Sequence, residues 1–133
     1  MLQRHTEVTT EFRRDECNPI TRDVLTRVGD KWTVFTVVVL GGGPKRFNEL
    51  KRSIDGISQR MLTLTLRTLE RDGIVTRSVF PTVPPRVDYA LTPLGMTLLR
   101  TVKDLHDWVS SNADEITQAR AEFDRRSAIQ QPL

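Results

Sequence analysis

The side chains best suited to chemistry in this sequence are three arginines on one predicted helix, which runs from Gln59 to Asp72. On a helical wheel, the arginines fall in one narrow stripe and three leucines fall on the opposite side. One face can therefore pack on a core while the other presents guanidinium groups, which donate hydrogen bonds in a fixed planar geometry. The two sets are Arg60, Arg67 and Arg71, and Leu62, Leu66 and Leu69.

The start of this helix suits contacts with the base edges of DNA. A helix fits the major groove, where arginine bonds guanine O6 and N7 and glutamine bonds adenine N6 and N7. Helices in this role use mainly their N-terminal part. The pattern predicts base contacts by Ser58, Gln59, Arg60 and Thr63, and a phosphate or base contact by Arg67. For this helix alone, the alternative of an ordinary amphipathic helix with a solvated arginine face stays open.

The preceding segment predicts the first half of a helix-turn-helix. A short helix is expected from Phe47 to Ile54, because its apolar residues share one face. Asp55-Gly56 is a turn signal, and Ser58 is a suitable N-cap for the arginine-bearing helix. Two helices joined by about three residues that include glycine are typical of this motif.

The N-terminal part of the chain is predicted to contain two further elements. Pro19 opens a helix from Ile20 to Val28, which ends at Gly29. Asp30 is an N-cap candidate for a second segment, Lys31 to Leu40. The length of this segment and its cap favour a buried helix, whereas its many β-branched residues favour a strand. Periodicity leaves both interpretations open.

Two short β-like runs follow the arginine-bearing helix. They extend from Ile74 to Phe80 and from Val87 to Leu91. The link between them, residues 81–86, contains three prolines, which lack a backbone donor, so a stiff protruding loop is expected. A hairpin with such a loop after a helix-turn-helix is a wing.

An apolar stripe begins after a predicted helix start at Thr92-Pro93. Leucine and valine recur there every three or four positions, which is typical of one helix face. We expect residues 111–115 to cap a further helix that carries Ile116 and Phe123. The stripe consists of Leu94, Leu98, Val102, Leu105 and Val109, with Trp108 beside it.

Composition limits the class of protein. With 133 residues, 38% hydrophobic and 28% charged, the chain fits one soluble globular domain. It contains no apolar run near the ~20 residues of a membrane span and no signal-peptide centre, which predicts a cytoplasmic location. The net charge of +3 is concentrated in residues 45–77, where eight basic side chains accompany four acidic ones. A polyanion-binding surface requires a local excess of this kind.

Catalytic and metal-binding constellations are missing from the pattern. His5 and His106 are far apart, and together with one cysteine they lack zinc-ligand spacing. The glycines at 41–43 begin a G-x-G, but Arg46 stands at the third glycine position and no Lys-Ser/Thr follows in P-loop register. We therefore expect no enzymatic activity, no cofactor and no metal, and we interpret these glycines as a loop that leads to a strand.

Six stretches of the chain resemble the HxlR-type helix-turn-helix regulators, a family similar to the broader MarR-like winged-helix group. The resemblance runs in register from about Gly29 to Trp108. Phe80, where the family pattern has Tyr, and Asp88, where it has Glu, are mild departures. The stretches are GDKWT at 29–33, RFNEL at 46–50, GISQRMLT at 56–63, LRTLERDG at 66–73, VPPRVDY at 83–89, and Leu91-Thr92 with Gly95.

The resemblance implies a homodimeric bacterial transcription factor with a winged helix-turn-helix fold. This fold is mainly α with a small β-hairpin wing (α+β), and its N- and C-terminal helices form the dimer interface. It implies that the segment from Lys31 to Leu40 is a helix. It divides the chain into an N-terminal arm (1–16), the family domain with its dimerisation helix (17–116), and a C-terminal helix and tail (117–133).

The resemblance also implies roles for individual residues. Lys45 and Arg46 are placed for the phosphate backbone, and Arg86 in the wing for a phosphate or the minor groove. A two-fold dimer binds a near-palindrome with half-sites about 34 Å apart. Burial of the apolar stripe within the monomer is the alternative to a dimer interface. The interface residues implied are Leu98, Val102, Leu105, Trp108 and Val109.

The single cysteine, Cys17, excludes an internal disulfide. Some members of the family are redox or electrophile sensors with a thiol near the N-terminus, where cysteine often precedes proline directly. In this sequence Asn18 intervenes. Arg13 and Arg14 would favour the reactive thiolate form if they lay close to it. A redox-sensing thiol and an ordinary thiol in an N-terminal arm both remain open.

A sequence-specific, dimeric transcriptional regulator is the leading hypothesis. Its partners would be double-stranded DNA and a second copy of the chain, with an oxidant or a small molecule as a candidate effector. The alternative is a winged helix used as a protein-interaction module, in which the basic face is incidental. A steep loss of duplex binding with added salt separates the two.

Overall fold

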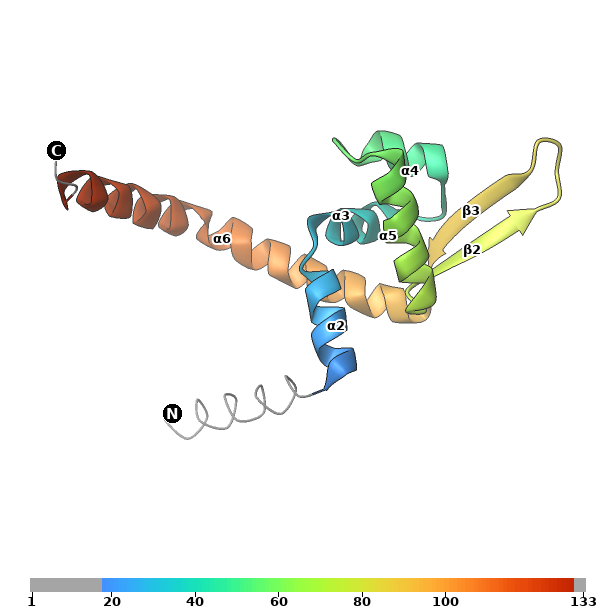
Figure 1. The fold of residues 1–133 in the computed structure, drawn as a ribbon, viewed down its shortest axis with the longest axis horizontal. Coiled ribbons are helices and arrows are strands. Elements are labelled where there is room, and N and C mark those ends of the chain that lie inside the picture. Colours follow the sequence, from blue (N-terminus) through green and yellow to red (C-terminus); the bar gives the residue numbers. More distant parts are fainter. Residues whose placement is uncertain (1–17, 131–133) are drawn as a thin grey trace.

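The computed structural model describes residues 18–130 of the chain (Figure 1). Helices form most of it, and a small antiparallel sheet projects from one end. This is the mainly α fold with a small wing that the sequence predicted. In chain order the elements are α2 (Pro19–Val28), α3 (Lys31–Leu40), β1 (Lys45–Arg46), α4 (Phe47–Ser53), α5 (Gln59–Arg71), β2 (Val75–Phe80), β3 (Arg86–Leu91) and α6 (Pro93–Gln130).

The ambiguous second segment is the helix α3, as the family resemblance implied. Its β-branched residues are tolerated because the core covers several of them, and tertiary burial outweighs their modest helix penalty. Thr36 is fully buried, and its hydroxyl donates a hydrogen bond to the Trp32 carbonyl oxygen at 2.7 Å. Asp30 occupies the N-cap position with extended backbone, but its side chain makes no capping hydrogen bond.

The hydrophobic core lies where α3, α4 and α5 meet the base of the sheet. Its largest fully buried side chains come from all four parts, so the helix-turn-helix is fixed by the core itself. They are Val37, Leu50, Leu62, Leu66, Leu69 and Val75. Burial of an aliphatic side chain contributes about 1.5–3 kcal/mol each, which makes this cluster the main source of stability.

The sheet has three strands in the order β1-β3-β2, all antiparallel. β2 and β3 form the predicted hairpin, in a register from Val75 opposite Leu91 to Phe80 opposite Arg86. The proline-rich loop joins their outer ends and leaves Val83 fully exposed. The hairpin projects from the body as a wing (Figure 1). β1 adds a short third strand at the base of the wing, where it pairs with β3.

α6 begins at a tightly fixed junction. The Thr92 hydroxyl accepts a hydrogen bond from the Gly95 N–H at 3.0 Å and donates one to the Gly73 carbonyl oxygen at 2.6 Å. A Cβ atom on Gly95 would lie 2.2 Å from the Ile74 carbonyl oxygen. Only glycine fits at this position, because the Ile74 backbone lies too close to Gly95 to leave room for a side chain.

The expected helix restart at residues 111–115 is wrong, because α6 continues without a break to Gln130. Asn112 does not cap a new helix, since its side-chain amide donates a hydrogen bond back to the Trp108 carbonyl oxygen at 2.8 Å. Residues 96–130 contain neither glycine nor proline, so nothing in this stretch interrupts the backbone ladder. Residues 116 and 117, the predicted boundary of the domain, therefore lie inside one helix.

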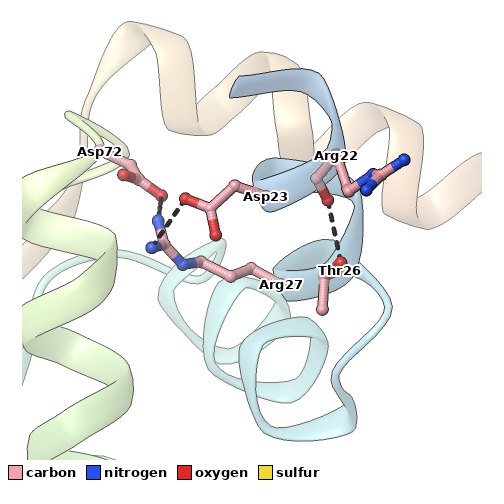
Figure 2. A network of polar contacts seen from close by, with 5 residues as sticks. All are labelled: Arg22, Asp23, Thr26, Arg27 and Asp72. Atoms are coloured by element: carbon pink, nitrogen blue, oxygen red, sulfur yellow. Dashed lines mark hydrogen bonds and ion pairs between the residues drawn. The ribbon is translucent and has the colours of Figure 1, made fainter. Parts of the chain in front are cut away.

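An ion-pair cluster ties α2 to the end of α5 (Figure 2). The Arg27 guanidinium donates a hydrogen bond to Asp72 at 2.5 Å and lies 3.0 Å from Asp23. The hydrogen bond to Asp72 and the charges of both carboxylates raise the pKa of Arg27. The Thr26 hydroxyl donates to the Arg22 carbonyl oxygen within α2. The C-cap of α5 is thus held from the N-terminal side of the chain.

Membrane-spanning length and apolarity do not coincide in any helix of residues 18–130.

Candidate nucleic-acid interface

The turn before α5 fixes where that helix begins. Gly56 has φ of +81°, a left-handed conformation that favours glycine. Ile54 and Ile57 on either side are buried, which anchors the turn to the core. The Ser58 hydroxyl oxygen accepts a hydrogen bond from the Met61 N–H at 3.0 Å, so Ser58 is the N-cap, as predicted.

α5 has one buried face and one exposed face, and the predicted leucines and arginines divide between them. Leu62, Leu66 and Leu69 are buried, whereas the arginines point outward. The arginine face of this helix is therefore exposed, as the sequence predicted. The exposed side chains of this face are Gln59, Arg60, Thr63, Leu64, Arg67, Glu70 and Arg71.

A hollow of about 340 Å³ separates α5 from the wing. It is lined on the helix side by Thr63, Arg67 and Glu70, and on the sheet side by Arg77 and Tyr89. Arg77 extends the basic surface from α5 onto β2. Arg77 belongs to the basic excess of residues 45–77, but it was not among the predicted site residues. The hairpin register, which pairs Arg77 with Tyr89, identifies it.

A second hollow, of about 490 Å³, lies between α4 and the strands β1 and β3. Arg46 and Arg86 meet here because β1 pairs with β3, in a register that sets Arg46 opposite Asp88. Asn48 and Arg52 line the same hollow from α4 and were not predicted as site residues. Asn48 and Arg52 are four residues apart, so they share one face of a short helix, and this spacing could have identified them from the sequence. Glu49 caps α4 by accepting the Arg46 N–H at 3.2 Å.

Arg86 is held in place by its neighbours. Its guanidinium donates two hydrogen bonds to Asp88, at 3.0 and 2.8 Å, and lies over the Phe80 ring at 5.2 Å from the centroid. The hydrogen bonds from Arg86, together with its charge and that of Arg46, lower the pKa of Asp88. The same pairing raises the pKa of Arg86. With 47% of its side chain exposed, Arg86 still presents charge to a partner.

The remaining predicted residues fall into three groups. Lys45 lies half-buried on β1, opposite Tyr89 of β3. Of the predicted interface residues, Leu98 is half-buried and Val102 is buried by the chain itself. Leu105, Trp108 and Val109 are exposed on α6. Cys17 lies outside the described residues.

Within residues 18–130, no three His, Cys, Asp or Glu side chains gather closely enough to hold a metal ion.

A helix-turn-helix with an outward basic face, followed by a wing, defines the class of winged helix-turn-helix DNA-binding proteins. Comparison with known proteins identifies the particular family. Residues 27–117 match the model of the HxlR-like helix-turn-helix family. The chain belongs to this family, and it is a transcriptional regulator of the HTH type.

Relatives with similar sequences and structures support this assignment. The HTH-type transcriptional regulator YtfH of Escherichia coli (strain K12) is 43% identical over 101 residues, which are 76% of this chain and 80% of YtfH. The structure of the transcriptional regulator ytfH from Salmonella typhimurium is 40% identical, with a TM-score of 0.70 over 76% of this chain and 90% of that one. The redox regulator HypR in its reduced form is 44% identical, with a TM-score of 0.68 over 73% and 96% of the chains.

Proposed function

We propose that the protein acts as a homodimer that inserts α5 of each copy into the major groove of a near-palindromic operator. The outward arginine face of α5, continued across the adjacent hollow by Arg77, is the observation that carries this proposal. Arginine is suited to this role because its planar fork bonds guanine in bidentate fashion. A regulator of this kind works in the compartment that holds the DNA, which in a bacterial cell is the cytoplasm.

Two kinds of contact are assigned to the site. Gln59 and Arg60 at the exposed start of α5, with Ser58 and Thr63, are assigned to base edges. Arg46 and Arg86 line the second hollow, and Lys45 precedes Arg46 on β1. These three residues are assigned to phosphates. Arg67 is assigned to a phosphate or to a nearby base. Phosphate contacts fix the register of the protein on the duplex, whereas base contacts read the sequence. The proposed role is therefore binding, with no catalytic step.

The exposed part of the α6 stripe is proposed to cover a second copy. Leu105 is 58% exposed and Trp108 is 59% exposed, values that are unfavourable for large apolar groups in a solvated monomer. Val102 contributes mainly to the core of its own chain, because only 5% of it remains exposed. Leu98 is intermediate between these two cases.

Substitution of Arg60 tests the reading helix. We expect Arg60→Ala to weaken operator binding by about 1–3 kcal/mol and to relax sequence preference, because one bidentate base contact is lost. Lys103→Ala, an exposed cation on α6, is the control and should bind as wild type. Arg86→Ala should weaken all duplexes more evenly. Fluorescence anisotropy titrations on specific and unrelated duplexes measure both effects. Equal operator affinity of wild type and Arg60→Ala would refute the assignment.

Salt dependence separates DNA binding from the alternative of a protein-interaction module. Each phosphate that a cationic side chain neutralises releases counterions, so the affinity should fall steeply as salt rises. Specific duplex should also compete better than unrelated duplex. A flat salt response with no preference among duplexes would favour the interaction module.

An oxidant effector is proposed for the same regulator, with Cys17 as the thiol that reacts. The similarity to HypR, which is a redox regulator, supports this test. We expect an oxidant to change operator binding by wild type and to leave Cys17→Ser unaffected. If both proteins lose binding to the same extent, Cys17 is an ordinary thiol.

A further inference from the structure

Leu64 is an apolar side chain near the centre of the exposed face of α5. It is 57% exposed, and every other exposed residue of α5 (Gln59–Arg71) is polar or charged. At about 100° per residue, Leu64 lies about 160° around the helix from the buried Leu62 and from the buried Leu66. Met61, at the border of the core, is half-buried instead. Leu64 is therefore turned away from the core.

The neighbours of Leu64 on this face distinguish it from an ordinary surface leucine. An exposed leucine is common on proteins and by itself indicates no function. Arg60 precedes Leu64 by four residues and Arg67 follows it by three, so all three side chains share one face. When these arginines approach DNA, Leu64 is removed from water with them. Its surface then needs an apolar partner, because contact with a polar edge would leave that edge without a hydrogen bond.

The adjacent residue, Thr63, adds a second apolar group to the exposed face. Its hydroxyl donates a hydrogen bond to the Gln59 carbonyl oxygen at 2.8 Å, within the helix. The single hydroxyl proton is thus used and cannot be donated to a base. The γ-methyl group of this exposed residue remains free to contact a partner. The exposed face of α5 therefore combines charged side chains with two apolar groups.

We propose that Leu64, aided by the γ-methyl group of Thr63, contacts the C5-methyl group of a thymine in each half-site. In the major groove, the edges of the bases present hydrogen-bond donors and acceptors, and only thymine adds a methyl group. This inference rests on the proposed function, in which α5 enters the major groove, and adds one base that the protein reads. Leu64 is then a specificity-determining residue that makes no hydrogen bond.

The spacing between Leu64 and Arg60 limits where this thymine lies. Four residues rise about 6 Å along a helix, whereas successive base pairs are about 3.4 Å apart. The thymine is therefore expected within about two base pairs of the guanine that Arg60 is proposed to bond. Each half-site would contain a guanine and a nearby thymine, read by two side chains one helical turn apart.

Removal of the thymine methyl group from the DNA tests the proposal with the unmodified protein. Full-length wild type first selects its preferred site from duplexes with a randomised central segment. Each thymine of that site is then replaced in turn by deoxyuridine, which lacks only the methyl group. At the contacted thymine, the replacement should weaken binding about fourfold per half-site, as expected for one buried methyl group. The other thymines are the matched controls and should change the affinity by less than about twofold.

Leu64→Ala connects the effect to this side chain. In this variant, the deoxyuridine penalty at the sensitive position should fall to less than about twofold, because alanine is too short to reach the methyl group. Leu64→Met keeps the apolar volume and should retain most of the penalty. The guanine preference assigned to Arg60 and the salt slope should persist in both variants, which distinguishes one lost base contact from a general loss of binding. Fluorescence anisotropy titrations provide the affinities.

The outcomes distinguish this inference from the proposed function. A selected site in which no thymine responds to deoxyuridine would overturn the inference, and so would an equal penalty in wild type and Leu64→Ala. In both cases, selective duplex binding that depends on Arg60 would leave the proposed function intact. Failure of wild type to select any duplex would overturn both. The wild-type series requires no substitution in the protein, so the test does not depend on the folding of a variant.

Discussion

α5 and the C-terminal half of α6 are both amphipathic helices, but their apolar faces meet different surroundings. On α5, Leu62 and Leu66 are almost completely buried by the rest of the chain. On α6, Leu105 and Phe123 remain exposed by more than half of their surface. α5 therefore leaves its polar face exposed, whereas the second half of α6 leaves its apolar face exposed.

The difference shows that an apolar stripe in a sequence predicts a buried helix face, but does not say whether the same chain or a partner buries it. The period of the stripe carries the further information. The buried positions of α5 (62, 65, 66 and 69) form the broad face of a helix on a core, whereas the large apolar residues at 105, 109, 116 and 123 of α6 recur at spacings of four and seven along a narrow stripe. Four predictions, from the largest expected effect to the smallest, test this contrast.

Truncation of one leucine on each helix should have different consequences. Leu66→Ala should lower the free energy of unfolding by about 2–5 kcal/mol, because it leaves a cavity at a side chain that is 2% exposed. Leu105→Ala should act mainly on the dimer dissociation constant, because the proposed dimer buries this side chain against a second copy. Urea unfolding and analytical ultracentrifugation measure the two quantities. The contrast fails if Leu105→Ala lowers monomer stability as much as Leu66→Ala.

Leu64→Ala is the matched control on α5. This leucine is 57% exposed on the same helix, so its truncation should change the free energy of unfolding by no more than about 0.5 kcal/mol. A loss comparable to that of Leu66→Ala would mean that the face carrying the arginines is packed against something within the chain.

The junction between body and α6 should be nearly as sensitive as the core. Gly95→Ala places a Cβ against the Ile74 backbone and forces α6 away from the sheet, which should destabilise the fold by about 1–3 kcal/mol. Gly42→Ala is the control, since its Cβ would lie 3.5 Å from the nearest atom. Thermal unfolding compares the two variants. Equal melting temperatures would show that the start of α6 is not fixed by this contact.

Much of the fold followed from local signals in the sequence. The turn at Asp55-Gly56, the cap Ser58 and the two leucine and arginine faces predicted the helix-turn-helix almost to the residue. α3 was ambiguous from its residues, because its β-branched content opposes the helix that burial imposes. The helix restart after Val109 was wrong, because polar residues that resemble a cap also fit on the surface of an uninterrupted helix.

The candidate site was less predictable where it depends on contacts distant in sequence. Arg46 and Arg86 meet only because the two-residue strand β1 pairs with β3, and so short a strand has no periodicity to detect. Arg77 joins the α5 face through the hairpin register, which the composition of β2 does not fix. Propensity and periodicity report local order, whereas pairing of distant segments places these side chains together.

Loss of one cation beside α5 should have a modest effect on DNA binding. Arg77→Ala should weaken binding to specific and unrelated duplexes alike and reduce the magnitude of the salt slope by about 1, as expected for one phosphate contact. Arg100→Ala removes an exposed cation of α6 and should leave the slope unchanged. Binding isotherms at several salt concentrations provide the slopes. The same reduction in both variants would mean that the basic surface is not confined to α5 and the wing.

The smallest effect is expected at Asp88, the carboxylate that holds Arg86 near the outer end of the wing. Its pKa is lower in the folded state because Arg86 hydrogen-bonds the ionised form. The ionised carboxylate therefore stabilises the fold fully above the unfolded pKa of about 3.9, and this contribution is lost as the pH falls through the folded value.

Asp88→Asn should remove that acid sensitivity, so its urea midpoint should fall less between pH 7 and pH 3 than the midpoint of wild type. Asp124→Asn on α6 is the control, because this exposed carboxylate has no ion-pair partner among residues 18–130 and should retain the wild-type dependence. If Asp88→Asn and wild type respond equally to acid, the Arg86 pairing contributes nothing to the wing. The charge of Arg86 would then be fully available to a phosphate, which would raise its share of DNA binding.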